Sequence, residues 1–198
     1  MVRETLFLLE SKSLYNKEIY DYARSRLIDR YVDINITDEQ LARFLLNDFI
    51  RYYRTITTDF EYKVSEAGKS WGLRNIKLTF SRKILYFAGV LVVAKTYKKK
   101  REDKIKTLQE LLELSPIERI EKICKSNENA LYLYDEFLSK ISDDRTRKTL
   151  EKVQREERKD CTEYVELKNK SKEFSKELQN ILEKTFDKDH PIHNALLF

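Results

Sequence analysis

The stretch GKSWGLRNIKLTFSRKILYFAGVLVVA, residues 68–94, indicates the fold class of this 198-residue chain. Its large apolar residues recur at spacings of three and four, which places them along one face of an α-helix. They are Leu73, Ile76, Phe80, Ile84, Phe87 and Leu91. The apolar run at 84–94 is far shorter than the ~20 residues that a membrane helix needs. We therefore expect a core helix that breaks from the preceding chain at Gly68, is capped by Ser70 and runs to about Tyr97.

The composition of the whole chain favours helices. Three glycines and two prolines are few, so long helices with short connections are expected rather than sheets. The predicted fold class is an all-α helical bundle with a long C-terminal helix or helical hairpin. The two cysteines, Cys124 and Cys161, have no metal-site spacing, and reduced thiols in a cytoplasmic protein are expected. The N-terminal sequence contains Glu4 and only a short apolar run, so it does not predict a signal peptide.

Helix-start residues precede two further expected helices in the first half of the chain. Asn16 is an N-cap residue, and the residues after it that we expect to face inward are Ile19, Tyr22, Ala23 and Ile28. TDEQ at 37–40 has the order of a capping box and predicts a helix through about Lys63. The core stripe expected on that helix is Leu41, Leu45, Phe49, Tyr52, Ile56 and Phe60.

The second half of the chain continues the helical pattern. KKKREDK at 98–104 is expected to be an exposed boundary, and SPIE at 115–118 has the residues of a capping box with a proline at the first helical position. The residues expected to face inward on a helix over about 127–141 are Leu131, Tyr134 and Leu138. After Ser142 a narrow apolar stripe predicts a long charged helix that packs in a hairpin or coiled pair. The members of this stripe are Leu150, Val153, Cys161, Tyr164, Leu167, Phe174, Leu178 and Ile181.

Basic residues are concentrated in the first half of the chain. Residues 1–100 carry 19 Lys and Arg against 12 Asp and Glu, whereas residues 101–198 carry 20 against 22. An excess of positive charge is typical either of a solvated basic face or of a protein with an anionic partner.

Polar side chains accompany the apolar stripes on two of the expected helices. The helix at 38–63 has a second face with Arg43, Asn47, Arg51, Arg54, Thr58 and Glu61. The helix of residues 70–97 carries one row with Arg74, Lys77 and Ser81, and a neighbouring row with Asn75, Thr79 and Arg82. A short connection favours antiparallel packing of these helices, which would bring their arginines together with Asp48 and Asp59 at the edge.

Two interpretations of this arginine cluster stay open. Guanidinium groups offer paired donors that suit phosphate or carboxylate oxygens, so the cluster predicts an anion site. In such a site the holding residues would be Arg51, Arg54, Arg74 and Arg82, the orienting residues Asn47 and Asn75, and the wall Trp71. Alternatively, the arginines pair with Asp48 and Asp59 and fasten the bundle.

The segments FLLNDFIRYYRTITTDFEYK at 44–63 and GKSWGLRNIKLTFSRKILYFAG at 68–89 resemble the helical C-terminal region of a group of poorly characterised bacterial nucleotidyltransferases. LFLLESKSLYNKEIYD at 6–21 is similar to the segment that joins this region to the catalytic domain. The resemblance implies a motif-bearing half at 1–100 and a helical extension at 101–198, packed as one domain. It implies a substrate-binding or accessory role, with the matching motif positions Asn47, Arg51, Arg54, Asp59, Trp71, Arg74, Asn75 and Arg82.

The catalytic part of such an enzyme is missing from this chain. Polymerase-β-like transfer needs a Gly-Ser turn for the triphosphate and clustered carboxylates for two metal ions, and the chain has no Gly-Ser pair. We therefore expect no catalysis by the chain alone, no cofactor and no metal. The expected partners are a nucleotidyltransferase domain or subunit and an anionic substrate, with a nucleotide or an RNA as candidates. No membrane partner is expected, and the long C-terminal helix offers a surface for oligomerisation.

A second class of function stays open, namely a nucleic-acid or protein interaction bundle. Its phosphate-contacting surface would comprise Arg51, Arg54, Arg74, Arg82 and KTYKKKR at 95–101. Other chemistries fit less well. A helical ribonuclease would need a histidine soon after an arginine, but His190 and His193 lie far beyond Arg158. These histidines, with Asp187 and Asp189, are more simply a polar tail than a metal site.

Overall fold

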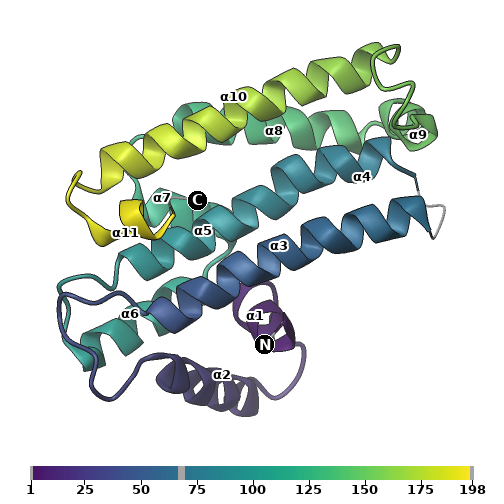
Figure 1. The fold of residues 1–198 in the computed structure, drawn as a ribbon. Coiled ribbons are helices and arrows are strands. Elements are labelled where there is room, and N and C mark those ends of the chain that lie inside the picture. Colours follow the sequence, from purple (N-terminus) through teal and green to yellow (C-terminus); the bar gives the residue numbers. More distant parts are fainter. Residues whose placement is uncertain (1, 67–69, 197–198) are drawn as a thin grey trace. The chain divides into compact units, whose positions relative to one another are not determined.

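The computed structural model describes residues 2–66 and 70–196, so the expected break at Gly68 lies outside it. All regular elements in these ranges are helical, which confirms the all-α fold (Figure 1). No helix in the same ranges has the length and apolar character needed to cross a membrane. In chain order the elements are α1 (Val2–Leu9), α2 (Lys17–Tyr31), α3 (Arg43–Ser65), α4 (Gly72–Lys77), the π-helical η1 (Leu78–Arg82), α5 (Lys83–Ala94), α6 (Arg101–Glu113), α7 (Pro116–Ile123), α8 (Glu128–Ser142), α9 (Asp144–Lys152), α10 (Thr162–Thr185) and α11 (Pro191–Ala195).

The helices pack into two compact units, each assembled from separate stretches of the chain. The first unit comprises Met1–Tyr52, Leu85–Lys125 and Thr185–Phe198, and the second comprises Tyr53–Ile84 and Ser126–Lys184. Helix α3 contributes its first part to the first unit and its last part to the second. Each unit therefore takes helices from both sides of residue 100.

The centre of the first unit is the contact between α5 and the first part of α3. Residues 90–94 of α5 are almost completely buried, and so are Leu45 and Phe49 of α3. Gly89 allows this close approach, because a Cβ atom there would lie 2.9 Å from Cδ2 of Phe49 and 2.9 Å from Cδ2 of Leu9. These burials confirm the apolar stripes predicted for both helices.

Two buried cations in the first unit each bind backbone carbonyls from separate parts of the chain. Arg119, 2% exposed, donates from Nε to the Leu111 carbonyl (3.2 Å) and from Nη2 to the carbonyls of Leu112 (2.8 Å) and Leu9 (3.2 Å). These carbonyls lie in the last turns of α6 and α1, where a helix lacks partners and its dipole is negative. Lys104 donates to the carbonyls of Thr96 (2.7 Å) and Asp38 (3.0 Å). Because Lys104 is fully buried, the expectation of an exposed boundary at 98–104 is wrong at this residue.

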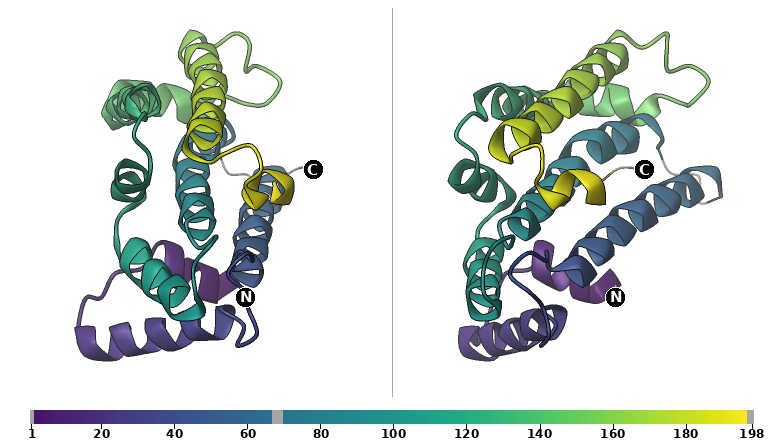
Figure 2. Two further views of the ribbon diagram at one scale, coloured as in Figure 1. Left: turned by 90° about the vertical axis from the view of Figure 1, so that its left-hand side faces the viewer. Right: turned by 60° about the vertical axis from the view of Figure 1, so that its left-hand side comes forward.

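Helix α2 lies against α6 in all views (Figures 1 and 2) but has a different buried face from the one expected. Ile28 is buried as expected, whereas Ile19, Tyr22 and Ala23 are exposed. The orientation is set by Arg24, which is buried and donates from Nη2 to the Leu8 carbonyl (3.4 Å). The apolar pattern did not indicate that the charged Arg24 would be buried, and the buried side of α2 is therefore opposite Ile19 and Tyr22.

The centre of the second unit is a cluster of aromatic rings from η1, α8 and α10. The Phe80 ring stacks on Phe137 with centroids 4.4 Å apart and on Phe174 at 5.2 Å. Tyr134 contacts both of these partners, at 5.6 Å and 6.0 Å. Stacked rings of this kind add to the free energy gained from burying their apolar surface.

Several helix ends differ from the expected ones. Thr37 and Gln40 form a turn in which the Thr37 amide donates to Oε1 of Gln40 (3.2 Å), and α3 begins only at Arg43. Ser70 makes no capping bond, because its hydroxyl oxygen is buried without a hydrogen-bond partner among the described residues. The helix beginning at Gly72 ends at Ala94 and contains a π-helical segment. The capping box at 115–118 is confirmed in both of its hydrogen bonds.

The long helix expected after Ser142 is interrupted. Helix α9 ends at Lys152, and α10 begins at Thr162. The Val153 carbonyl accepts a hydrogen bond from the Gly72 amide (3.1 Å), so α4 receives the group that a continuing helix would use itself. The buried residues of α10 nevertheless include Tyr164, Leu167, Phe174, Leu178 and Ile181 of the predicted stripe. On α8 the predicted residues are half-buried, and the fully buried ones are Ala130, Leu133 and Phe137.

Candidate functional site

Helices α4 and α10 of the second unit run alongside each other and share a chain of polar and aromatic contacts (Figure 1). Trp71 and Tyr164 pack with ring centroids 5.2 Å apart. One helical turn further on, Oδ1 of Asn75 accepts hydrogen bonds from the Tyr164 hydroxyl (2.9 Å) and from Nζ of Lys168 (3.1 Å). Burial raises the pKa of Tyr164 to about 12, so its hydroxyl keeps the proton that it donates. Asn75 therefore connects a tyrosine hydroxyl to a lysine ammonium group.

The π-helical segment η1 separates this contact from a second lysine. Nζ of Lys83, just after η1, donates to Oγ of Ser175 on α10 (2.6 Å). Asn75 and Lys83 are eight positions apart, whereas their partners Lys168 and Ser175 are seven apart. The wider π-helical turn accommodates the additional residue on the α4 side, and such turns are frequent at functional sites. We call Asn75, Lys83, Tyr164, Lys168 and Ser175 the α4–α10 cluster.

The electrostatics of the α4–α10 cluster are those of a site with surplus positive charge. Burial lowers the pKa of Lys83, and the charge of Lys168 lowers it further. Burial also lowers the pKa of Lys168, with an additional contribution from Lys172. Among the described residues, neither Lys83 nor Lys168 forms an ion pair with a carboxylate. Both side chains are half-buried.

Lys77 extends this basic surface toward α9. Its pKa is lowered first by burial, then by Arg147, while Glu151 raises it and Arg74 lowers it. Glu151 lies 3.5 Å from Arg147 and so is already engaged with another cation. The net charge around Lys77 is therefore positive.

The eight residues expected at a site lie in both units. Those in the first unit are Asn47 and Arg51, and those in the second are Arg54, Asp59, Trp71, Arg74, Asn75 and Arg82. In the second unit, Asn75 and Trp71 meet α10, whereas Arg54, Arg74 and Arg82 are exposed. Trp71 is buried, and its ring packs in the core against Tyr164.

The two carboxylates expected at the edge of the arginine cluster have nearer partners. Asp48 accepts a hydrogen bond from the Tyr31 hydroxyl (2.7 Å) and lies 3.9 Å from Nη1 of Arg51. Asp59 pairs with Lys63 one helical turn away, at 2.5 Å. The Asp48–Arg51 contact lies within α3 and so does not fasten one helix to another, and both interpretations of the arginines stay predictions.

The sequence analysis did not single out Lys83, Lys168 and Ser175, which belong to the α4–α10 cluster. A signal was present on the C-terminal stripe, because Lys168 and Ser175 follow the buried Tyr164 and Ser171 by four positions each and so lie on the same side of α10. A lysine and serines at the edge of a narrow apolar stripe indicate a polar seam beside the core. Helical periodicity could not predict the extra residue in η1. This residue brings Lys83 beside Ser175 of α10.

Two hollows outside the cluster are less suited to an anion. One, of about 290 Å³, lies between α2 and α6 and contains Asp21, Glu110 and Glu113 beside Arg24. The other, of about 540 Å³, is at the connection of α9 and α10 and contains Glu157, Asp160 and Glu163. Carboxylates in both would repel a phosphate.

The tail histidines have packing roles. Nδ1 of His190 accepts from the Ile192 amide (3.2 Å) at the start of α11, and its ring packs edge-on to Tyr97 at 4.7 Å. The described residues contain no group of three or more His, Cys, Asp or Glu side chains arranged for a metal ion. Neither Cys124 nor Cys161 forms a disulfide bond within the described part of the chain.

No protein family, no curated protein and no solved structure matches this chain.

Proposed function

We propose that this chain is a helical accessory domain of a nucleotidyltransferase system, which binds an anionic substrate and does not catalyse transfer by itself. The α4–α10 cluster is the binding site, and the bound group is a phosphate of a nucleotide or an RNA. Arg74 and Arg82, exposed on the same segment of chain, extend the site. The observation that carries this proposal is the pair of half-buried lysines, Lys83 and Lys168, held without a carboxylate partner among the described residues.

Physical chemistry supports an anion at this place. Partial burial of an ammonium group costs free energy, and a second ammonium nearby increases the cost. A phosphate group would offset both terms, because it offers several acceptor oxygens to charged donors. The Asn75 side-chain amide adds a neutral donor to the two cations.

The alternative function is a broader nucleic-acid interaction surface that includes the basic segment 95–101. Salt separates the two functions. Affinity for a long phosphate backbone falls steeply with salt because many counterions are released, whereas a site for one phosphate group loses much less.

The test is direct binding of ATP and of a short single-stranded RNA to the purified chain, by calorimetry at two salt concentrations. Lys83→Gln and Lys168→Gln should each weaken binding about tenfold or more, since each removes a charged hydrogen bond to the ligand. Lys106→Gln in α6 is the matched control, because it removes the same charge from an exposed position in the first unit. Its affinity should stay within about twofold of the parent.

The absence of catalysis is tested separately. Incubation of the chain with labelled nucleoside triphosphates, a divalent metal and candidate acceptors should give no transfer product, because the triphosphate turn is missing. Turnover that depends on Asp48 or Asp59 would contradict the accessory role. Equal binding by parent, Lys83→Gln and Lys168→Gln would contradict the site.

A further inference from the structure

The outward face of α2 in the first unit exposes several large apolar side chains. Leu14 and Tyr15, just before the helix, are 101% and 92% exposed, and Ile19 and Tyr22 on its first turns are 65% and 67% exposed. Ile19 and Tyr22 are three positions apart and lie on one side of the helix, and Leu14 and Tyr15 directly precede its N-cap residue, Asn16. Grouped apolar side chains of this size mark interaction surfaces. We call these four residues the α2 outer face.

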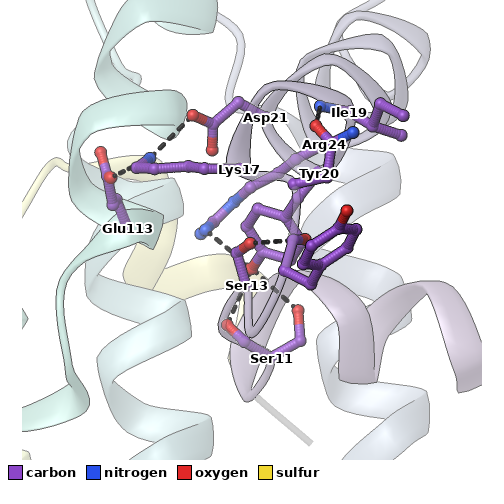
Figure 3. A network of polar contacts seen from close by, with 10 residues as sticks. Ser11, Ser13, Lys17, Ile19, Tyr20, Asp21, Arg24 and Glu113 are labelled. Carbon is purple, nitrogen blue, oxygen red and sulfur yellow. Dashed lines mark hydrogen bonds and ion pairs between the residues drawn. The ribbon is translucent and has the colours of Figure 1, made fainter.

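Helix α2 is held firmly from its other side, so it cannot turn to bury this face. Lys17 pairs with Asp21 (2.7 Å) and with Glu113 of α6 (3.1 Å). Arg24 donates from Nη1 to the Tyr20 hydroxyl (3.3 Å), and Figure 3 shows Ile19 pointing away from all of these contacts. The Asn16 side chain caps the helix by accepting from the Ile19 amide (3.2 Å). A rotation that buried Tyr22 would break the contacts of α2 with other elements, namely the Lys17–Glu113 ion pair and the hydrogen bond from Arg24 to the Leu8 carbonyl (3.4 Å).

Charged residues of opposite sign flank the α2 outer face. Glu18 and Arg26 are exposed, one helical turn before and one after Tyr22, and form no ion pair among the described residues. If two copies of α2 lie antiparallel with their Tyr22 residues opposite each other, Glu18 of each copy faces Arg26 of the other. The face is therefore complementary in charge to itself, as an interface with two-fold symmetry requires.

We propose that the α2 outer face binds a second copy of this chain in an antiparallel, two-fold symmetric dimer. Exposed tyrosines suit such a role, because aromatic side chains are enriched at interface centres. One helix face buries less than the roughly 800 Å² per partner of a standard interface, so the dimer is weak, in the micromolar range or above. This inference goes beyond the proposed function and does not depend on it.

The experiment is sedimentation velocity of the full chain from about 1 µM to about 1 mM, which spans weak association. The parent should sediment faster as its concentration rises. Tyr22→Asp should remain monomeric across the range, because it places a charge at the centre of the interface. Tyr132→Asp is the control, because Tyr132 on α8 is 65% exposed in the second unit and should not affect association.

Charge exchange identifies the partner as a second copy. Glu18→Arg and Arg26→Glu should each weaken the dimer, since each places like charges opposite one another. The double variant should restore it, because the two charges exchange places across the symmetric interface. A parent that stays monomeric at all concentrations would overturn the proposal. So would association that survives Tyr22→Asp, or a double variant that is not restored.

Discussion

Arg119 stabilises the ends of two helices from a buried position, so its replacement should be costly. Arg119→Met keeps most of the side-chain volume but leaves the carbonyls of Leu9 and Leu112 buried without this donor. We expect a loss of about 2–4 kcal/mol in the free energy of unfolding, measured by chemical denaturation. Arg119→Lys should recover part of that loss, because an ammonium group reaches fewer acceptors. The exposed Arg145→Met should change stability by less than about 0.5 kcal/mol. Equal stabilities for Arg119→Met and the parent would show that the two helix ends need no cap.

Gly72 and Gly89 both allow close packing, but substitution should affect them differently. A Cβ atom on Gly72 would lie 2.6 Å from the Leu150 carbonyl oxygen, which belongs to the backbone, and 2.7 Å from Cβ of Val153. Gly72→Ala should therefore lower the free energy of unfolding by about 1–3 kcal/mol. At Gly89 the nearest atoms are the ends of the Leu9 and Phe49 side chains, which can move, and alanine favours the helix by about 1 kcal/mol. Thermal unfolding should show the smaller loss for Gly89→Ala. The reverse order would contradict the assignment of the rigid contact to Gly72.

At the scale of elements, the α4–α10 cluster should make stability depend on pH in a predictable direction. The unfolded chain holds the Lys83 proton up to an ordinary pKa of 10.5, whereas burial lowers this pKa in the folded protein. Just below pH 10.5 the unfolded state therefore binds more protons, and the free energy of unfolding rises with pH. The parent should gain stability relative to Lys83→Met as the pH approaches 10.5 from below.

Lys170 on α10 provides a control of opposite sign. Its hydrogen bond to Glu136 raises its pKa above 10.5, so its stabilising contribution is present below that pH and is lost as the pH rises through the folded value. Relative to Lys170→Met, the parent should lose stability above pH 10.5. Parallel pH profiles for the two variants would contradict the buried environment assigned to Lys83.

The elements also show which physical signals the sequence carried. The apolar stripes of α3, α5 and α10 were predictable, because long runs at a constant spacing have only one way to be buried. The face of α2 was not, because Arg24 is buried through hydrogen bonds to Tyr20 and the Leu8 carbonyl. The break before α10 was not predictable either. No glycine or proline marks residues 153–161, and the partner of the Val153 carbonyl is distant in sequence.

The site followed the same division. Asn75 was predictable because it lies in a polar row beside a core stripe. Lys83 and Lys168 were not, since their proximity depends on how α10 pairs with the segment that contains η1. Whether any of the eight predicted residues, Asn75 included, takes part in binding stays a prediction, as does the resemblance to nucleotidyltransferases.

At the scale of the whole molecule, neither unit is a continuous segment, so no simple truncation should fold. A fragment of residues 1–100 lacks Arg119 and Lys104 of the first unit, and it lacks the partners of Phe80 in the second. We expect it to have helical content without a cooperative thermal transition, measured by circular dichroism. The full chain should unfold cooperatively under the same conditions. A cooperative transition in the fragment would show that the first half of the chain folds by itself.

The packing of Trp71 against Tyr164 has an optical consequence. Trp71 is the only tryptophan of the chain and is buried in the second unit. Light that tyrosine does not absorb therefore excites a single reporter, whose emission should shift to longer wavelength only when the second unit opens. The first unit contains no tryptophan and does not contribute to this emission, whereas circular dichroism records the helices of both units. If the units unfold one after the other, the emission and ellipticity curves will have different midpoints in denaturant. The midpoint of the Trp71 emission shift then shows whether the second unit unfolds first or last.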